Sequence, residues 1–460
     1  MAEIPTILQE IVQNRRSHVP GIAEHIQGMP EPTKSSRSLY RALNGANRFI
    51  MECKSASPSL GLIRADYRPG DIARIYSRYA SAISVLCEPD RFGGDYDHLA
   101  TVAASTHLPV LCKDFIIAPE QVRAARLFGA DAILLMLSIL SDSEYQELAS
   151  IAGEYDLDIL TEVISEEEMA RAATLGARII GINHRNLHDL TIDISRSAEL
   201  APLAPEGALV IAESGIRDHA TVRDVAKHVN GFLVGSQLTG QPDVDRACRE
   251  LVYGVNKVCG LTTPRAAQMA RAAGAVYGGL IFEPASPRNV SRETSEKIMA
   301  AEPNLEYVAV SRRTENFSEL NIAGVHAYQI HAPLQDSVAA EIALIDAAQA
   351  ALPGKAIWRA VSMTDPRGAK YASALADHVD LLILDSGDGG TGESFDWSCI
   401  PGEVLQRSLL AGGIGPHNVL AAHKVGCRGV DVNSGVEYAH SVEKDATKLM
   451  SVFESIRKDR

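Results

Sequence analysis

Residues 48–54, RFIMECK, form a short apolar run with two ionisable side chains at its end, Glu52 and Lys54. Four later runs repeat this arrangement: PVLCKDF at 109–115, DILTEV at 158–163, IIGINHR at 179–185 and ALVIAES at 208–214. Runs of this length and composition are typical of buried parallel strands, and the polar residues stand where each strand stops. Barrels of parallel strands build their active site from these carboxyl ends, so the pattern predicts one converging site.

Strand-like runs occur eight times in each half of the chain, separated by helical patterns such as SEEEMARAATLGA at 165–177. We therefore predict an α/β fold of two tandem (β/α)8 TIM barrels, the first with an N-terminal helical extension in residues 1–47. The helical pattern at 243–254 ends the first barrel, which gives domains of 1–254 and 255–460. A doubly wound open sheet is the alternative, because periodicity does not distinguish closed from open parallel sheets. The expected strands are 48–54, 82–88, 109–115, 132–137, 158–163, 179–185, 208–214 and 231–236, then 256–260, 276–282, 306–311, 327–332, 355–362, 380–385, 408–413 and 429–434.

Composition argues against several classes of protein. The 460 residues carry a formal net charge of −14, which is unfavourable for binding nucleic acid or an anionic membrane. The seven cysteines include no CxxC pair and several lie inside apolar runs, so we expect reduced thiols and a cytoplasmic protein. No signal peptide is expected, and no apolar run approaches the ~20 residues of a membrane-spanning helix.

The charged strand ends of the first half suggest acid–base chemistry. Glu52 and Lys54 are two residues apart in a strand, so their side chains point to the same side. By themselves they are equally well explained as a structural ion pair. Lys113 and Glu162 at further strand ends favour a catalytic cluster, because acids and bases in such clusters tune one another.

The last two strand ends of the first half are small and suited to an anion. The stretches Glu213-Ser214-Gly215 and Gly235-Ser236 expose backbone N–H groups, and barrels often bind phosphate at these two loops. Either stretch alone would be an ordinary turn. Together they predict a phosphorylated substrate.

The second half places a thiol and an acid at two strand ends. Cys259 ends the run KVC, although a cysteine is more often a small core residue than a catalytic one. Asp385 ends the apolar run LLILD, where packing explains it less well. The loops with Gly412 and Gly413 and with residues 433–435 repeat the phosphate pattern of the first half.

Residues 387–392, GDGGTG, match the GxGxxG pattern of dinucleotide-binding proteins. A true fingerprint opens directly into a helix, whereas ESFDWSCIPG at 393–402 has the composition of a loop. A nucleotide-dependent oxidoreductase therefore remains an alternative that a nicotinamide-binding titration would test.

The first half resembles indole-3-glycerol-phosphate synthases in its motifs MECKSASPS, LCKDF, LTEV, GINHRNL, AESGI and GFLVGS, at 51–59, 111–115, 160–163, 181–187, 212–216 and 231–236. The resemblance implies ring closure of carboxyphenylamino-deoxyribulose phosphate with loss of CO2 and water. It implies Lys113 as general acid, Glu162 as proton-transfer partner and Lys54 as the cation facing the substrate carboxylate. It further implies that Glu52, Asn183 and Glu213 orient the reacting groups, while the substrate and its phosphate lie among Ser57, Phe92, Phe115, Leu134, Arg185, Ser214, Gly215, Gly235 and Ser236. His184 departs from the family, which commonly has Asn there, and little effect is expected.

The second half resembles phosphoribosylanthranilate isomerases in KVCGLT, GGLIF, SPRNV, LAGGIG and DVNSGVE, at 257–262, 278–282, 286–290, 410–415 and 431–437. The resemblance implies an Amadori rearrangement with Cys259 as general base, Asp385 as general acid and Arg288 contacting the anthranilate carboxylate. It implies phosphate contacts at Gly412, Gly413, Ser434 and Gly435. The stretches VAVSRRT at 308–314 and YQIHAP at 328–333 depart from the family, so the loops after these strands are expected to differ.

The two resemblances together imply a bifunctional enzyme of tryptophan biosynthesis, a lyase and decarboxylase joined to an isomerase. The implied partners are small phosphorylated anthranilate-sugar substrates, with no nucleic acid and no membrane, and the implied chain is a monomer without cofactor or metal. The histidines show no HxH or HExxH grouping, in line with a site that needs only acids and bases. One catalytic barrel joined to a non-catalytic scaffold barrel is the alternative, because fold alone does not guarantee activity.

Overall fold

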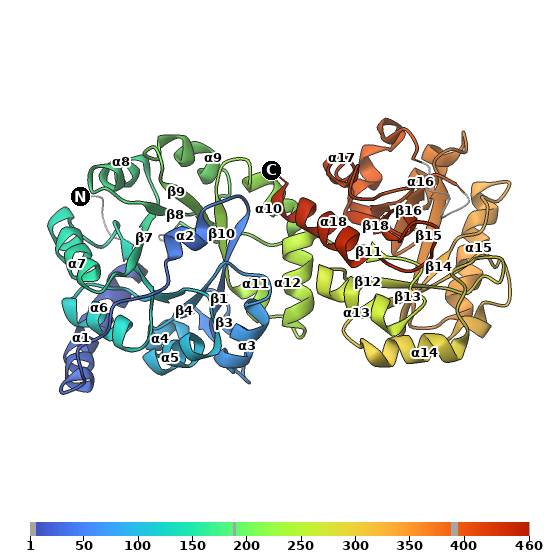
Figure 1. Cartoon of the computed structure of the whole chain (residues 1–460). Helices are drawn as coiled ribbons and strands as arrows, with labels where there is room; N and C mark the ends of the chain where they lie inside the picture. Colours follow the sequence, from blue (N-terminus) through green and yellow to red (C-terminus); the bar gives the residue numbers. More distant parts are fainter. Residues whose placement is uncertain (1–5, 187–189, 388–393, 460) are drawn as a thin grey trace. The chain divides into compact units, whose positions relative to one another are not determined.

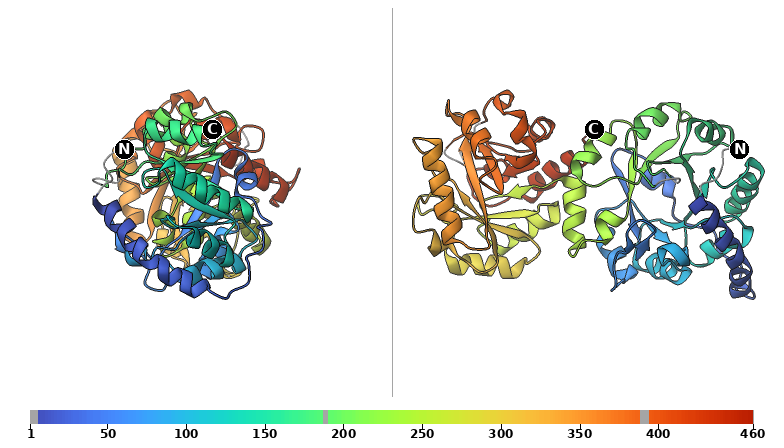
Figure 2. Two further views of the ribbon diagram at one scale, coloured as in Figure 1. Left: turned by 90° about the vertical axis from the view of Figure 1, so that its left-hand side faces the viewer. Right: turned by 180° about the vertical axis from the view of Figure 1, so that it is seen from behind.

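The computed structural model describes residues 6–186, 190–387 and 394–459, and it divides into two compact units that meet in sequence between Leu251 and Val252. Each unit contains a closed barrel of eight parallel strands inside a layer of helices (Figures 1 and 2). The prediction of two tandem TIM barrels is therefore confirmed, and the open doubly wound sheet is excluded.

The first barrel closes because β1 pairs on both sides. Ile50 lies opposite Ala82 of β4 on one side and opposite Leu233 of β10 on the other. The remaining strands follow one another in chain order around the ring. The eight strands are β1 (Arg48–Cys53), β4 (Ala82–Leu86), β5 (Val110–Lys113), β6 (Ala132–Met136), β7 (Asp158–Val163), β8 (Ile179–Asn183), β9 (Leu209–Glu213) and β10 (Gly231–Val234).

Several helices of the first unit begin at a residue whose side chain caps them. Ser141 and Glu144 form a reciprocal capping box at the start of α7, and Ser165 accepts a hydrogen bond from Glu168 N at the start of α8. The helices between and after the barrel strands are α3 (Pro69–Tyr76), α4 (Pro89–Phe92), α5 (Tyr96–Ser105), α6 (Pro119–Leu127), α7 (Asp142–Glu154), α8 (Glu166–Thr174), α9 (Arg196–Leu200), η1 (Ala201–Leu203), α10 (His219–Val225), α11 (Ser236–Thr239) and α12 (Val244–Tyr253). A small hairpin of β2 (Ala56–Ser57) and β3 (Gly61–Leu62) follows β1.

The predicted N-terminal extension is present as α1 (Thr6–Ile26) and α2 (Leu39–Leu43). Arg15 of α1 is buried, and its Nε donates to Asp114 Oδ1 at 2.9 Å, one residue beyond Lys113. A buried pair of this kind is costly to break, because removal of one partner leaves the other charge uncompensated. The extension is thus tied to the carboxyl end of β5.

The second barrel has the same ring order with fewer α-helices. Its strands are β11 (Lys257–Val258), β12 (Tyr277–Ile281), β13 (Glu306–Ser311), β14 (Val325–Ile330), β15 (Ala356–Ser362), β16 (Leu381–Asp385), β17 (Ser408–Leu410) and β18 (Gly429–Val432). Its helices are α13 (Pro264–Ala273), α14 (Arg292–Ala301), α15 (Val338–Ala351), α16 (Gly368–Leu375), α17 (Val419–Lys424) and α18 (Ala446–Lys458). Among the described residues, only the 3-10 turn η2 (Phe317–Leu320) separates β13 from β14, and the turns η3 (Trp397–Cys399) and η4 (Gly402–Arg407) precede β17; η5 (Ser434–Val436) follows β18.

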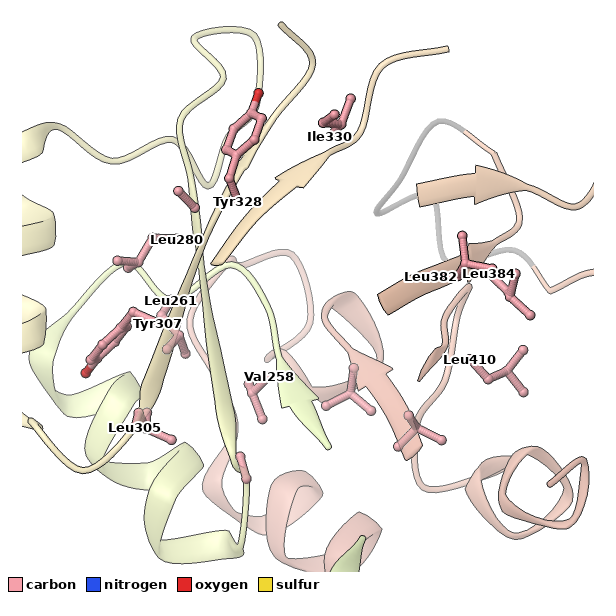
Figure 3. Packing of buried hydrophobic residues seen from close by; sticks show 14 of the residues in the cluster. Val258, Leu261, Leu280, Leu305, Tyr307, Tyr328, Ile330, Leu382, Leu384 and Leu410 are labelled. Atoms are coloured by element: carbon pink, nitrogen blue, oxygen red, sulfur yellow. The ribbon is translucent and has the colours of Figure 1, made fainter. Parts of the chain in front are cut away.

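Strand alternation separates two layers of core in the second barrel. Tyr307, Leu382 and Leu384 pack outward in the cluster that includes the helix residues, and Figure 3 shows them with Val258 and Leu280. Val308 and Ile383, the alternate residues of the same strands, belong to a separate inner cluster that also contains Cys259. Because side chains alternate along a strand, this sets which polar residues face the inside of the barrel.

Candidate active sites

The first barrel has a cavity of about 510 Å3 at the carboxyl ends of its strands. Interior residues such as Leu111, Leu160 and Ile211 are each followed two positions later by a predicted site residue, which therefore also points inward. All fifteen residues predicted for this half line the cavity: Glu52, Lys54, Ser57, Phe92, Lys113, Phe115, Leu134, Glu162, Asn183, Arg185, Glu213, Ser214, Gly215, Gly235 and Ser236.

Lys113 is the centre of an ion cluster in this cavity. Its ammonium donates to Glu213 Oε2 and lies 3.9 Å from Glu162 Oε2. Burial by itself would lower the pKa of Lys113, but Glu213, Glu162 and Glu52 hold that pKa above its ordinary value. Lys113 is consequently charged inside the cavity.

Glu162 has the opposite tendency. Burial and the neighbouring Glu213 raise its pKa to about 8, although Lys113 and the amide of Asn183 act against them. Asn183 Nδ2 donates to Glu162 Oε1 at 3.2 Å and so fixes the orientation of the carboxyl group. A carboxyl group that titrates near neutral pH is suited to both giving and taking a proton.

Glu52 and Lys54 form an ion pair on the cavity wall, in which Lys54 Nζ lies 2.9 Å from Glu52 Oε1, directly beside Gly235. A Cβ atom at Gly235 would lie 2.5 Å from Glu52 Oε1 and 3.0 Å from Lys54 Nζ. Only glycine leaves room for the pair at that position. The ion pair, for which the sequence left a structural and a functional role open, therefore lies inside the cavity.

The loop after β9 has an unusual backbone. Ser214 has φ +66° and Gly215 has φ +76°, a left-handed conformation that is uncommon for serine. His184 supports this turn, because its Nδ1 lies 2.9 Å from Ser214 O and its Nε2 lies 2.7 Å from Ser197 Oγ. Burial lowers the pKa of His184, so the ring is neutral in this role.

Apolar side chains cover one side of the cavity. The rings of Phe92 and Phe115 lie 6.0 Å apart between centroids. The sequence left open whether the N-terminal helices cover the mouth or the bottom of the barrel, and α1 contributes Ile7, Leu8 and Ile11 to this wall at the mouth. A helical pattern alone does not specify where an extension packs.

The second barrel has a separate cavity of about 440 Å3, again at the strand ends. It is lined by all seven residues predicted for this half: Cys259, Arg288, Asp385, Gly412, Gly413, Ser434 and Gly435. The glycine-rich stretch after Gly387 that suggested a dinucleotide site, residues 388–393, lies outside the described residues.

Asp385 is buried, and burial raises its pKa. Ser386 N donates to its Oδ1 at 2.7 Å, and His331 Nε2 lies 3.5 Å from its Oδ2. Burial lowers the pKa of His331 to about 4, so this contact is not an ion pair at neutral pH. A carboxyl group whose protonated form is favoured is suited to act as an acid.

The guanidinium group of Arg288 is held by a neighbouring acidic residue, Glu437. Its Nε and Nη2 each donate to Glu437 at 2.8 Å, a bidentate pair that fixes the guanidinium plane. Lys444 Nζ donates to the same carboxylate at 2.6 Å. A substrate carboxylate would therefore meet a guanidinium group that is already positioned.

Several polar residues of the second cavity were not predicted from the sequence. Asp431, Gln329 and His331 line it, and Lys257 lies beneath it with its ammonium 2.6 Å from Asp431 Oδ2. In KVC, YQIH and VDV these polar residues alternate with apolar ones, and this alternation could have indicated that they point into the barrel. The departure noted at 328–333 thus falls on the cavity wall.

The described ranges contain neither a candidate membrane-spanning helix nor a candidate metal-binding cluster. No helix there is both long enough and apolar enough to cross a membrane. In the same ranges, no group of three or more His, Cys, Asp or Glu side chains is arranged to hold a metal ion.

Comparison with known proteins matches both halves of the chain. Residues 4–251 match the family described as indole-3-glycerol phosphate synthase, and residues 256–455 match N-(5'phosphoribosyl)anthranilate (PRA) isomerase. The tryptophan biosynthesis protein TrpCF of Corynebacterium glutamicum is 62% identical and aligns over 98% of both chains. The protein of the same name from Yersinia pestis is 43% identical over 98% of this chain and 94% of that one. Among solved structures, phosphoribosyl anthranilate isomerase from Thermus thermophilus aligns with 44% of this chain and 98% of its own length, at 27% identity and a TM-score of 0.37.

Proposed function

The chain belongs to the TrpCF family of tryptophan biosynthesis proteins, which join an indole-3-glycerol phosphate synthase to a PRA isomerase, and from this premise we propose how its residues perform the two reactions. It is a bifunctional enzyme, a decarboxylating lyase in its first half and an isomerase in its second. The observation that carries the residue assignment is that each barrel gathers its complete predicted set in one cavity.

In the synthase barrel, Lys113 donates a proton to the ketone oxygen of carboxyphenylamino-deoxyribulose phosphate as the ring carbon attacks. The ammonium beside Glu213 is protonated, so it carries the proton to be donated and its charge stabilises the negative charge that develops on that oxygen. Lys54 faces the carboxylate that leaves as CO2. Glu162, with a pKa of about 8, then moves the protons of the dehydration step.

Binding in this barrel follows from the remaining cavity residues. The anthranilate ring lies against Phe92, Phe115 and Leu134, and the phosphate lies at the loops of Ser214 and Ser236. Glu52 and Asn183 orient Lys54 and Glu162, with which they are in contact.

In the isomerase barrel, Asp385 protonates the ring oxygen of phosphoribosylanthranilate as the sugar opens, and Cys259 removes the proton from C2. Arg288 binds the anthranilate carboxylate, and the phosphate lies at Gly412, Gly413, Ser434 and Gly435. The raised pKa of Asp385 supports its role as the acid. The product is the substrate of the first barrel.

A reciprocal pair of variants tests these assignments. Lys113→Met removes the proton donor, and Cys259→Ser replaces the thiol with a group of far higher pKa, so each should lower one activity by ~10^2-fold or more and leave the other unchanged. Both activities are assayed on each purified full-length variant. Synthase activity of Lys113→Met within about tenfold of the parent would overturn its role as the acid, and a folded Cys259→Ser protein with normal isomerase activity would return Cys259 to a packing role.

The cysteines and the two separate cavities also bear on the setting of the enzyme. All seven cysteines are free thiols and six are buried, which suits a reducing cytoplasm. Two self-contained sites suit a monomer that uses small phosphorylated substrates. Gel filtration with light scattering measures the oligomeric state.

A further inference from the structure

Lys257 is a fully buried cation inside the second barrel that the proposed reaction does not use. Val258 of the short strand β11 packs outward, so its two neighbours, Lys257 in the strand and Cys259 directly after it, both point inward. The lysine side chain has no exposed surface. A buried ammonium requires compensation, and its position decides which other groups feel its charge.

The thiol of Cys259 and the end of the Lys257 side chain converge on Gly279 of β12. A Cβ atom at Gly279 would lie 2.7 Å from Cys259 Sγ and 3.0 Å from Lys257 Cε. Any larger residue at this position would occupy the space in which the two side chains approach each other. The thiol and the lysine side chain are therefore neighbours at this glycine.

Asp431 of β18 holds the ammonium from the other side. Lys257 and Asp431 are direct partners in the register of the two strands, and Nζ lies 2.6 Å from Oδ2. The lysine therefore has one anionic neighbour, and a second anion would form beside it whenever Cys259 loses its proton.

We propose that Lys257, held by Asp431, is the positioning residue that stabilises the thiolate form of Cys259. A thiolate in a buried site is unfavourable unless a cation lies beside it. The proposal rests on the proposed role of Cys259 as the base, and it adds the group that makes a buried thiol usable for that role.

Other charged and titratable groups also face this region. Burial raises the pKa of Cys259, and Asp431 raises it further, whereas Lys257 and Lys444 lower it. Within the described part of the chain, the groups around the thiol and Lys257 include Asp431 on β18, Asp385 on β16, His331 after β14, Arg288 on the cavity wall, and the buried Lys444 with its partner Glu437. Among these cations, Lys257 is the one that lies two residues before Cys259 in the chain and points into the barrel beside it.

The test measures the thiolate directly. Full-length protein is alkylated with iodoacetamide, a neutral reagent, between pH 6 and 10, and the rate at Cys259 is followed by peptide mass spectrometry. Because only the thiolate reacts, the alkylation rate rises with pH, and the pH at which it reaches half of its maximum is the apparent pKa of the thiol. Exposed Cys399 in the same molecule serves as the internal reference for the reagent.

Two variants should shift the Cys259 midpoint in opposite directions. Lys257→Met should raise it by at least about one pH unit, which is a tenfold loss of alkylation rate at a fixed pH below the midpoint. Asp431→Asn should lower it, because a negative charge beside the thiol is removed. Lys355→Met is the matched control, since Lys355 binds Val325 O at the other end of the barrel and should leave the midpoint unchanged.

Opposite shifts support the proposal, because a purely structural ion pair would change unfolding temperature without moving the two midpoints apart. An unchanged midpoint in folded Lys257→Met would overturn it. If Lys257→Met does not fold, the Asp431→Asn variant is the deciding one. A Cys259 alkylation midpoint that is unchanged or higher in Asp431→Asn would then overturn the proposal. The isomerase rate of Cys259→Ser is a separate measurement, so a failure of the base assignment is distinguishable from a failure of the lysine effect.

Discussion

At the scale of single residues, the synthase site obtains its chemistry from burial. Glu162 and Lys113 are ordinary ionisable groups, and in water they would have well-separated pKa values. Inside the barrel, burial and Glu213 raise the pKa of Glu162 to about 8, while the acidic neighbours of Lys113, Glu213 foremost, keep it charged. The same carboxylate, Glu213, acts in both effects.

The raised pKa of Glu162 has a cost in stability that depends on pH. Between its unfolded pKa of about 4.3 and its folded pKa of about 8, the unfolded chain releases a proton that the folded chain retains, so stability falls as pH rises. Glu162→Gln removes this dependence. We expect the variant to gain stability relative to the parent from about pH 5 to pH 8, by on the order of 1–3 kcal/mol, with no further gain above that. Urea unfolding at several pH values measures the difference, and a difference that stays flat over this range would contradict the prediction.

The sequence identified the residues of the site more completely than their contacts. Most of the predicted residues stand at the end of an apolar run, which is a local signal, whereas Ser57, Phe92 and Arg288 were implied only by the family resemblance. The contact between Lys113 and Glu213 joins positions 100 residues apart, and only closure of the barrel brings them together. Lys257 was not predicted because a lysine at the start of an apolar run looks like a strand end at the surface, whereas it is fully buried.

At the scale of elements, glycines inside strands make room for functional side chains. Gly181 of β8 lies beside β9, and a Cβ atom there would be 2.0 Å from Glu213 Oε1. Glycine normally weakens a strand, so its position here is explained by the carboxylate that it accommodates.

Gly181→Ala should displace Glu213 and with it the ammonium of Lys113. We expect synthase activity to fall at least ~10-fold while isomerase activity stays normal, because small misplacements of reacting groups are costly. The matched control is Gly153→Ala in α7, where no neighbour lies within 4 Å and alanine should be neutral or stabilise by about 0.5–1 kcal/mol. Unchanged synthase kinetics in Gly181→Ala would show that the site adapts to the methyl group.

Predicted elements agreed with the structure at their starts more closely than at their ends. The run 231–236 was expected to be strand throughout, but β10 ends at Val234 and α11 begins at Ser236. The run 408–413 likewise ends as strand at Leu410, since Gly412 and Gly413 have φ +88° and +62°. Apolar periodicity defines where a strand is buried, whereas its end depends on turns that small residues permit.

At the scale of the whole molecule, the chain is two barrels whose sequence boundary is set by packing. The prediction placed the boundary after residue 254, but Val252 and Tyr253 belong to the second compact unit. The Tyr253 ring lies 5.7 Å from that of Phe453 in an edge-on arrangement, and Asn256 Nδ2 donates to Tyr253 O at 2.6 Å. Asn256 in turn accepts a hydrogen bond from Val430 N on its side-chain Oδ1. Its backbone carbonyl oxygen accepts hydrogen bonds from the N–H groups of Val276 and Tyr277.

Separate isomerase fragments test where the second domain begins. A fragment of residues 252–460 retains Tyr253, and one of residues 255–460 lacks it and leaves Asn256 near a free end. We expect both to be folded and to catalyse the isomerase reaction, with the shorter one less stable by about 1–3 kcal/mol because it loses an aromatic contact and buried apolar area. Urea unfolding of the two fragments measures the difference, with Tyr253→Ala in the longer fragment as the control that should reproduce most of it. Equal midpoints would place the boundary at 254 and reduce Tyr253 to a linker residue, because a side chain that belongs to the core of a domain cannot be removed without loss of its burial energy.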